Sequence, residues 1–568
     1  MWEHNYQPIA DSLGMSALVA VIPIVVLFVM LGALRKPAWM SAMAALASAF
    51  VIALAAYGMP LQLTVMSTLF GAAFGMFPIA WIVFSSILLY RLAVDTGKFE
   101  IIKGSIGGLT DDRRLQALFI AFSFGAFIEG AAGFGAPVAV SGAMLAGLGF
   151  NPFYAAGICL LANTAPVAFG SIGTPIITLA NVTGLPVLAL SAMVGRLCAM
   201  LSVLIPGYLM VVMVGRRKAI QVLPAIAACG VSFAGVQLYV SNTLGPELTD
   251  IMSSLTCIGV MVLFLKLWKP KEILRLEGDK PITAAVEKHS GGQVFMAWLP
   301  YMLLVVSVLT FGAPSIKAKV NTWTDGFMPD TVRAEPVTHP TVAGRLNRIG
   351  VPGLHNMITQ VPPVVPKKTP YAALFEFNWL TASGTACFLA AIAAALCLGV
   401  GPRQFGGIYI ATFKQLSKAM VTIASMLGLA YLMNYSGMTS TLGLSLARTG
   451  RLFPFFSAFV GWLGVFLTGS DTSANALFGN LQVVTANALS LNPILTAAVN
   501  SAAGVMGKMI SIQSIAVAVA ATGMTSKDES RLFRFTIKHS ILLMVVMGLL
   551  SMMFAYVLPN YVPVIPPK

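Results

Sequence analysis

Three charged residues of this chain stand in apolar sequence, and their types are those expected of an anion site with a proton carrier. Glu129 lies in "GAFIEGAAGFGAPVAV", Asp471 in "GWLGVFLTGSDTSANALF" and Lys508 in "GVMGKMISIQSIA". A charge placed within a bilayer costs at least a few kcal/mol, so each side chain should face the protein interior or a partner. A buried lysine can neutralise an anion. A buried carboxylate can bind and release a proton, because burial favours its neutral form.

We therefore predict that Lys508 neutralises a bound anion and that Glu129 or Asp471 carries a proton. The sequence does not decide between the two acids. Polar and small residues nearby are expected to complete the site. The further substrate-binding residues that we predict are Asn163, Thr164, Asn500, Ser501, Gly130, Gly469 and Ser470.

A structural interpretation competes with each of these assignments. A salt bridge, such as one between Asp471 and Lys508, would satisfy the charges without any ligand. Arg196 lies in the regular apolar segment "SAMVGRLCAM", and the sequence leaves both interpretations open for it. Glycine-rich segments also occur where helices pack closely, but Asn, Thr and Ser accompany the glycines here. The six cysteines stand singly, without metal-ligand spacing, so we expect no metal and no cofactor other than the coupling proton.

The composition is that of a membrane protein. Of 568 residues, 57% are hydrophobic and only 10% are charged, and apolar runs of about 20 residues recur along the chain. We predict one all-α polytopic membrane domain, 1–568, with about 12 transmembrane helices plus two re-entrant hairpins in an inverted-repeat arrangement. The alternation typical of a β-barrel is missing. We attribute the net charge of +15 to cytoplasmic loops rather than to nucleic-acid binding.

The distribution of basic residues predicts the orientation of the chain. Most of the 35 Lys and Arg residues fall in alternate loops, which are therefore expected on the cytoplasmic side. Both termini and the loop 313–378 are then extracytoplasmic. No cleavage site follows the first apolar run, so we expect it to be retained as a span. Residues 403–418 are expected to form a separate amphipathic helix at the cytoplasmic interface.

Two regions of the sequence resemble each other. The pattern F-x-x-G, then N-P, then N-[ST]-A-x4-G occurs first in 38–241 and again in 379–558. Each copy contains an interrupted apolar region, 115–149 and 452–490, which we predict to be a hairpin entering from the cytoplasmic side and from the outer side, respectively. Inverted repeats of this kind with broken helices build many secondary transporters.

Four segments rich in Gly, Ala and Pro should form the hairpin tips and the unwound middles of helices. They are "GAAGFGAP", "NTAPVAFGSIGTP", "TGSDTSAN" and "NSAAGVMGK". Non-helical backbone within a membrane survives only where it is buried or lines a water-filled cavity. We therefore expect the chain to be unwound at 163–170 and at 500–507.

The motifs quoted above, together with "NTAPVAFG" at 163–170, closely resemble those of the bacterial L-lactate permease family. The similarity extends over nearly the whole chain. It implies proton-coupled uptake of L-lactate, commonly also of D-lactate and glycolate, across the bacterial inner membrane. It also implies a relationship to organic-anion transporters that use two re-entrant hairpins. One departure is "NSAAG" at 500–504, where "NTTGG" is expected, and this difference bears on the substrate range.

Three functional hypotheses follow. The first is a proton–monocarboxylate symporter, the second a sodium-coupled or exchange carrier for a related anion, and the third a channel. An enzyme is not expected, because no nucleophile–base pair, metal cluster or nucleotide motif is present in the sequence. The expected partners are a small monocarboxylate and the lipid bilayer, without nucleic acid. A homo-oligomer is compatible with the sequence, which does not determine the oligomeric state.

Overall fold

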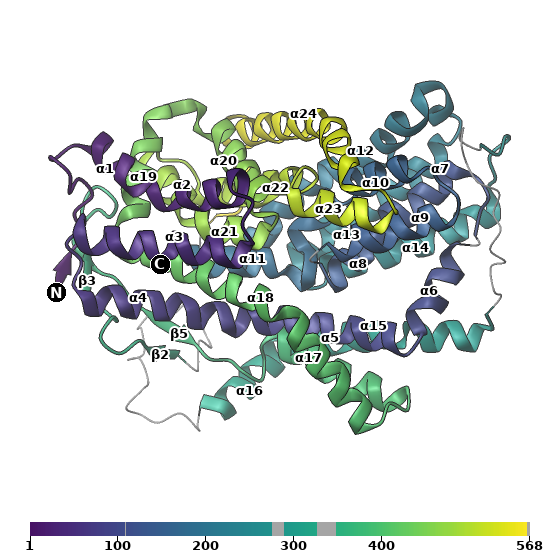
Figure 1. Cartoon of the computed structure of the whole chain (residues 1–568), viewed down its shortest axis with the longest axis horizontal. Helices are drawn as coiled ribbons and strands as arrows, with labels where there is room; N and C mark the ends of the chain where they lie inside the picture. Colours follow the sequence, from purple (N-terminus) through teal and green to yellow (C-terminus); the bar gives the residue numbers. More distant parts are fainter. Residues whose placement is uncertain (108, 134, 275–288, 326–347, 565–568) are drawn as a thin grey trace.

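Apolar helices of membrane-spanning length dominate the computed structural model, which describes residues 1–107, 109–133, 135–274, 289–325 and 348–564. Within these residues 11 helices are long and apolar enough to cross a membrane, and two bent helix pairs raise the number to 13. The predicted all-α polytopic membrane protein with about twelve spans is confirmed. The helices fill most of the molecule in Figure 1.

The chain begins with helices that pack against a later segment. The elements before the first hairpin are α1 (Leu13–Ala20), α2 (Ile22–Phe28), η1 (Val29–Ala33), α3 (Ala38–Ala55), α4 (Leu61–Phe74), η2 (Gly75–Ala80), α5 (Trp81–Asp95) and α6 (Lys98–Gly107). Both α3 and α4 pack on α18 (Pro402–Tyr435). Gly71 permits this approach, since a Cβ there would lie 2.3 Å from the carbonyl oxygen of Leu427.

The 34-residue helix α18 corrects one prediction. Residues 403–418 do not form a separate interfacial helix but continue without a break into the apolar span that follows. The polar residues Arg403, Gln404, Lys414 and Lys418 therefore extend a membrane helix beyond its apolar part. No Pro or Gly after Gly407 interrupts the segment before Gly428, so nothing in its local sequence ends the helix.

Both predicted hairpins are helical. The first consists of α7 (Arg113–Gln116), η3 (Ala117–Phe124), α8 (Gly125–Ala131) and α9 (Ala136–Gly147). The second consists of α20 (Phe453–Thr468) and α21 (Asp471–Ala488), preceded by α19 (Met438–Leu446) and η5 (Ala447–Leu452). Each hairpin reverses at glycines with positive φ: Gly133 at +63° and Gly135 at +84° in the first, and Gly469 at +70° in the second. Only glycine adopts such a backbone without strain.

A bent helix pair follows each hairpin, and its start is encoded by the N-P motif. Asn151 caps α10 (Pro152–Ala162) by accepting a hydrogen bond from the Phe153 amide, and Asn492 caps α22 (Pro493–Lys508) through the Ile494 amide. Proline at the first helical position completes this N-terminal signal.

The two breaks differ from each other. Between α10 and α11 (Gly170–Thr183) the chain unwinds at the predicted segment, with η4 (Val167–Phe169) within it, and bends by 65°. In the second pair the expected unwinding at 500–507 is wrong, because α22 is helical through Lys508. The bend of 41° comes between α22 and α23 (Ile512–Ala521).

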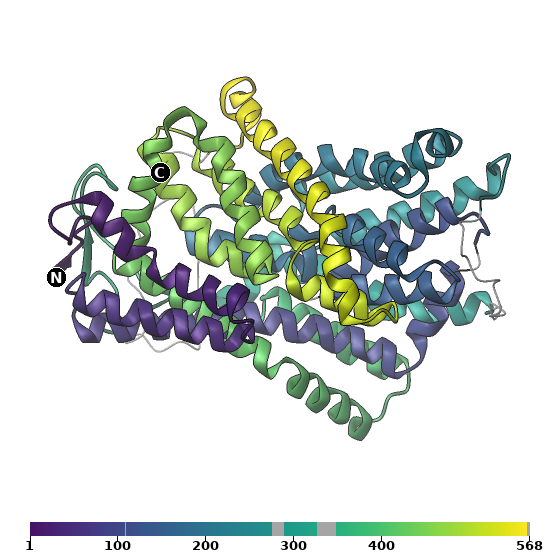
Figure 2. The same ribbon diagram turned by 45° about the horizontal axis from the view of Figure 1, so that its top comes forward.

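The remaining long elements flank these motifs. They are α12 (Val187–Ile220), α13 (Leu223–Thr243), α14 (Thr249–Leu267), α15 (Gly291–Gly312), α16 (Pro314–Asp325), α17 (Ser383–Cys397), η6 (Ser526–Asp528), α24 (Glu529–Tyr556) and η7 (Pro559–Tyr561). In both Figure 1 and Figure 2 the helices around the first hairpin (blue) lie beside those around the second (green and yellow). Contacts of α11 with α21, of α12 with α22 and of α9 with α23 join the two groups.

Short strands gather at the end of the molecule that holds the N-terminus (Figure 1). Strand β1 (Trp2–Glu3) pairs in parallel with β3 (Ile358–Gln360), which pairs with β4 (Thr369–Pro370), and β2 (Arg348–Gly350) pairs with β5 (Leu374–Glu376). The pairing of β1 with β3 therefore places the N-terminus against residues 358–360 of the predicted loop 313–378. Part of that loop, 326–347, lies outside the described residues.

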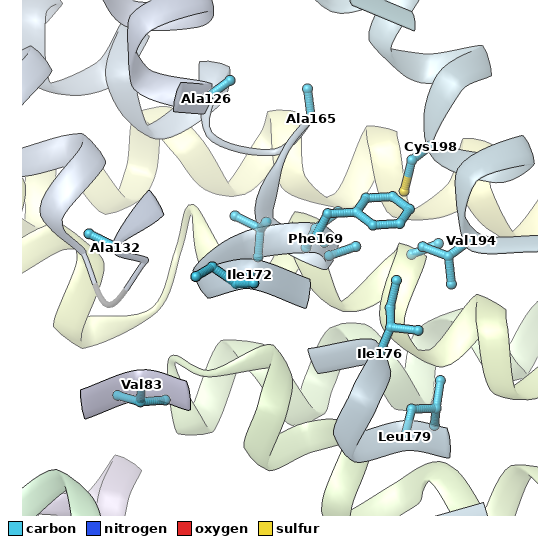
Figure 3. Packing of buried hydrophobic residues seen from close by; sticks show 14 of the residues in the cluster. Val83, Ala126, Ala132, Ala165, Phe169, Ile172, Ile176, Leu179, Val194 and Cys198 are labelled. Carbon is cyan, nitrogen blue, oxygen red and sulfur yellow. The ribbon is translucent and has the colours of Figure 1, made fainter. Parts of the chain in front are cut away.

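The broken segment after α10 is enclosed by apolar side chains. Figure 3 shows Phe169 and Ile176 near Val194 and Cys198 of α12, with Ile172 on the other side of Phe169. Phe169, Ile172 and Ile176 are fully buried. This packing holds irregular backbone deep inside the protein, where the lipid cannot reach it.

Candidate functional site

The tips of the two hairpins and the two helix breaks meet at one cavity of about 540 Å³. Four charged residues line it: Glu129, Asp471 and Lys508, the three that the sequence singles out, and the exposed Lys418 of α18. Its polar lining residues include Ser171, Thr468, Ser470, Thr472, Ser473, Gln513 and Ser514. This volume is within the range of about 300–1,000 Å³ typical of small-molecule sites.

Glu129 and Lys508 form an ion pair across the cavity wall. The Nζ atom of Lys508 lies 2.8 Å from Oε1 of Glu129, and the two residues are only 8% and 2% exposed, Lys508 being the more exposed one. Glu129 comes one turn before the tip of the first hairpin, and Lys508 is the last residue of α22. The second oxygen of Glu129, Oε2, has no hydrogen-bond partner among the described residues. The pair is thus able to exchange partners with a bound anion or proton.

Asp471 occupies the corresponding tip of the second hairpin. Ser470 caps α21 by accepting a hydrogen bond from the Ser473 amide, so Asp471 begins the helix, where its positive end favours a carboxylate. Oδ2 of Asp471 accepts hydrogen bonds from Ser501 Oγ at 2.5 Å and from Asn475 Nδ2 at 3.3 Å. Oδ1 has no partner within the part of the chain that the structure describes.

The unwound start of α11 lies directly against Glu129. A Cβ at Gly170 would be 2.5 Å from Glu129 Oε1, so only glycine fits there. Ser171, Ile172 and Gly173 follow with φ of 46°, 58° and 69°. A left-handed β-branched residue such as Ile172 is rare and strained, and such strain tends to persist at functional sites. The hydroxyl of Ser171, which contacts Ser86 Oγ at 3.2 Å, lines the cavity.

The structure also places the other predicted residues. Gly469 and Ser470 line the cavity. Asn163 and Thr164 line a small adjoining void together with Lys508, and Oδ1 of Asn163 finds no hydrogen-bond donor in the described parts of the chain. The Thr164 hydroxyl donates to the Leu161 carbonyl at 2.7 Å.

Four further predicted residues line neither the cavity nor the adjoining void. Asn500 accepts a hydrogen bond from Gln482 and donates one to Asn475. Ser501 donates a hydrogen bond to Asp471, which itself lines the cavity. Gly130 packs against α14, where a Cβ would lie 2.7 Å from Asp250 Cβ. Arg196 hydrogen-bonds to Asn242 and to the Tyr561 carbonyl, which ties α12 to the C-terminal segment.

Sequence reasoning missed several residues of the site. Asn475 links Asp471, Ser501 and the Pro175 carbonyl of α11, and it stands one turn after Asp471 in "DTSAN". Gln513 and Ser514 follow the bend after Lys508 in "KMISIQSIA". Their polar character in an apolar segment is a signal that could have been used. Asp250, which does not line the cavity, stands at the start of a regular span, where an acid is ordinary and gives no signal.

Comparison with known proteins agrees with this architecture. A family model described as L-lactate permease matches residues 16–558, nearly the whole chain. The chain belongs to the L-lactate permease family. It is therefore a member of a family of bacterial multi-pass membrane proteins, and the resemblance found in the sequence motifs is confirmed.

Relatives of this permease-family chain align along their full length. The L-lactate permease of Bacillus subtilis (strain 168) is 46% identical, with 99% of this chain and 100% of that protein covered. Glycolate permease GlcA of Escherichia coli (strain K12) is 44% identical, with 98% of each covered. The L-lactate permease of the same strain is 42% identical, with 99% and 100% covered.

A solved structure also aligns with this chain. It is the Alcanivorax borkumensis YdaH transporter, at 14% identity and a TM-score of 0.44, with 86% of this chain and 87% of that one covered.

Proposed function

We propose that the chain is a secondary active transporter that carries L-lactate into the cell by symport with protons. D-lactate and glycolate, which share the 2-hydroxy monocarboxylate group, are its further substrates. The names of its relatives, L-lactate permease and glycolate permease, support this substrate class. We place it in the bacterial inner membrane with both termini extracytoplasmic, on the basis of its loop charges.

The observation that carries the proposal is the buried ion pair of Lys508 with Glu129 at 2.8 Å beside the cavity. A substrate carboxylate needs one positive group, and Lys508 is a basic residue buried at the cavity. While Glu129 is ionised it competes with the substrate for Lys508. Protonation of Glu129 releases the lysine, and it also offsets the charge that the anion brings into a poorly solvated site. Binding of the anion and of a proton therefore favour each other.

The remaining groups of the cavity suit a small hydroxy acid. Ser470 and Ser514 offer hydroxyl groups, and Gln513 offers an amide, to the substrate hydroxyl and carboxylate. Asp471 is held in place by Ser501 and Asn475, so it is the second candidate for the coupling acid. The cavity is larger than one lactate requires, which leaves room for water to deliver protons.

A sodium-coupled or exchange carrier for a related anion is the second candidate. It is favoured by the break between α10 and α11 next to the site, because an interrupted helix leaves backbone carbonyls outside the regular helical hydrogen-bond pattern. Such carbonyls coordinate sodium in transporters with broken helices.

Transport by purified protein in liposomes distinguishes the proton symporter from the sodium-coupled or exchange carrier. An inward lactate gradient is imposed with a pH-sensitive dye inside, in sodium-free and in sodium-containing buffer. We expect internal acidification that accompanies lactate entry and does not depend on sodium. Uptake that requires sodium and leaves the internal pH unchanged would overturn the proposal in favour of the second candidate.

A further inference from the structure

A third buried carboxylate, that of Asp250, lies against the hairpin that carries Glu129, and none of the roles above uses it. Asp250 is in the first turn of α14 and is 1% exposed. Neither of its carboxylate oxygens has a hydrogen-bond partner among the described residues. The hydroxyls nearest in sequence are engaged elsewhere, because Ser253 donates to the Thr249 carbonyl and Ser254 to the Asp250 carbonyl.

Asp250 is packed against the hairpin that carries Glu129. The first turn of α14 touches α8 so closely that a Cβ on Gly130 would lie 2.7 Å from Asp250 Cβ and 3.2 Å from the Ile251 amide nitrogen. Gly130 is the residue after Glu129, and its lack of a side chain permits this contact. The two acids are thus held on adjoining helices by a glycine of the "FIEG" motif.

The charges that face Asp250 are those of the transport site. Asp250 interacts electrostatically with Glu129 and Lys508. The helices that pack on α14 most closely are α13, α8, η3 and α11, and Glu129 is their one charged residue among the described ones. Glu247, three residues before Asp250, instead contacts Ser383 on α17.

One lysine cannot neutralise two buried carboxylates. An ionised carboxylate that is buried without a donor or a cation costs several kcal/mol, whereas its protonated form avoids most of that cost. Lys508 is in direct contact with Glu129. We propose that Asp250 is a second proton-binding residue of the transport site, which holds a proton in this conformation and, when it loses that proton, competes with the substrate for Lys508. This inference rests on the proposed proton coupling and extends it.

The affinity for lactate should depend on pH through both acids. Lactate binding requires Glu129 to be protonated, and at alkaline pH it requires Asp250 to regain a proton as well. By linkage, the slope of log affinity against pH gives the number of protons taken up on binding. For the unchanged protein we expect a slope of about one proton near neutral pH that steepens toward about two in alkaline solution.

Lactate affinity is measured by calorimetric titration of purified protein over a pH series. Asp250→Asn imitates the protonated acid, so its slope should stay at about one proton throughout. Glu247→Gln is the matched control, since it removes a nearby carboxylate that does not face the site, and it should retain the steepening. A profile of Asp250→Asn that superimposes on that of the unchanged protein would overturn the proposal.

The pH dependence of lactate affinity in Glu129→Gln is a second test of the role of Asp250, and it does not require Asp250→Asn to fold. Asp250 should still confer a slope of about one proton on this variant in alkaline solution. A flat profile would overturn the role of Asp250. If the unchanged protein itself shows no slope at any pH, the proposed proton coupling fails, and this result is distinct from a failure of the Asp250 assignment alone.

Discussion

Lys508 Nζ lies 2.8 Å from Glu129 Oε1, although 379 residues separate the two along the chain. The contact joins the tip of the first hairpin to the end of α22, which belongs to the second repeat-like region. A movement of the two regions relative to each other that separates these two residues would break the ion pair. Binding of an anion at Lys508 can therefore be coupled to the relative position of the two helical regions.

Glu129→Gln should abolish uphill accumulation of lactate while lactate exchange across the membrane continues. With one proton per lactate, a pH gradient of one unit supports about tenfold accumulation, because one pH unit corresponds to about 1.4 kcal/mol. Without the coupling acid the ratio should fall to about one. Radiolabelled lactate in liposomes with an acidic exterior measures this ratio.

Glu100→Gln is the control for this experiment, because Glu100 is an exposed carboxylate that pairs with Lys103 on α6. It should keep the full accumulation ratio. Undiminished accumulation by Glu129→Gln would exclude Glu129 as the coupling acid and leave Asp471 as the candidate.

The sequence led to the main charges of the site because a charged residue in apolar sequence needs an interior location. Glu129, Asp471 and Lys508 were found in this way, and the N-P caps at Asn151 and Asn492 marked the starts of both bent pairs. Which charges form the pair could not be read, because it depends on how the two regions pack. The structure pairs Lys508 with Glu129 rather than with Asp471.

A segment rich in glycine and alanine occurs both where a helix unwinds and where two helices pack closely. This ambiguity explains the wrong prediction at 500–507. A Cβ at Gly507 would lie 2.3 Å from the Trp462 carbonyl, and one at Gly504 would lie 2.6 Å from Asp471 Oδ1. These glycines allow α22 to pack closely against α20 and the hairpin tip, without any unwinding. The glycines and Pro166 of 163–170, by contrast, do accompany a break. Only tertiary contacts distinguish the two cases.

Ser501→Ala should lower transport although Ser501 does not touch the cavity. The serine donates to Asp471 Oδ2 at 2.5 Å, and its loss leaves that oxygen only the 3.3 Å contact with Asn475. A hydrogen bond to a charged group contributes about 1.5–3 kcal/mol, so kcat/KM for lactate should fall by roughly ten- to a hundredfold. Initial rates of uptake in liposomes measure the change.

Ser540→Ala is a matched control for that variant. Its hydroxyl is equally buried, but it donates to the Met506 carbonyl and accepts from Trp462 Nε1, and neither partner is charged. Its effect should appear in the unfolding temperature and not selectively in kcat/KM. Equal losses of transport in the two variants would contradict a specific role for the bond to Asp471.

Gly461→Ala should destabilise the protein, because the added methyl group meets backbone. Its Cβ would lie 2.1 Å from the Asn500 carbonyl oxygen, at the contact of α20 with α22. Overpacking of this kind costs about 1–3 kcal/mol. The displacement would also move Asn500, which bonds to Asn475 beside Asp471. We expect a lower unfolding temperature in detergent together with reduced uptake.

Gly235→Ala on α13 is the control, and it should not lower the unfolding temperature. A methyl group added at Gly235 would have no atom of the described residues within 4 Å, so alanine there only raises helix propensity, by about 0.5–1 kcal/mol. An unfolding temperature of Gly461→Ala equal to that of Gly235→Ala would contradict the close packing of α20 on α22.

Acid should release the N-terminal segment. His4 is buried, and its Nε2 bonds to the Tyr435 carbonyl at 2.9 Å. Burial lowers the pKa of His4 to about 4, and the bond to Tyr435 opposes this shift only in part. Between pH 6.5 and about 4 the released segment binds a proton that the docked segment does not, so docking weakens as the pH falls. The loss is on the order of 2–3 kcal/mol.

Hydrogen exchange of the first residues measures this docking, because the Trp2 and His4 amides bond to the Met357 and Thr359 carbonyls at 3.0 Å. After correction for intrinsic rates, their exchange should be faster at pH 5 than at pH 7.5. In His4→Gln, which has no titrating ring, the protection should not depend on pH in this range. His289→Gln, at a partly exposed site, should keep the acid sensitivity. The assignment to His4 is contradicted if His4→Gln remains as acid-sensitive as the unchanged protein.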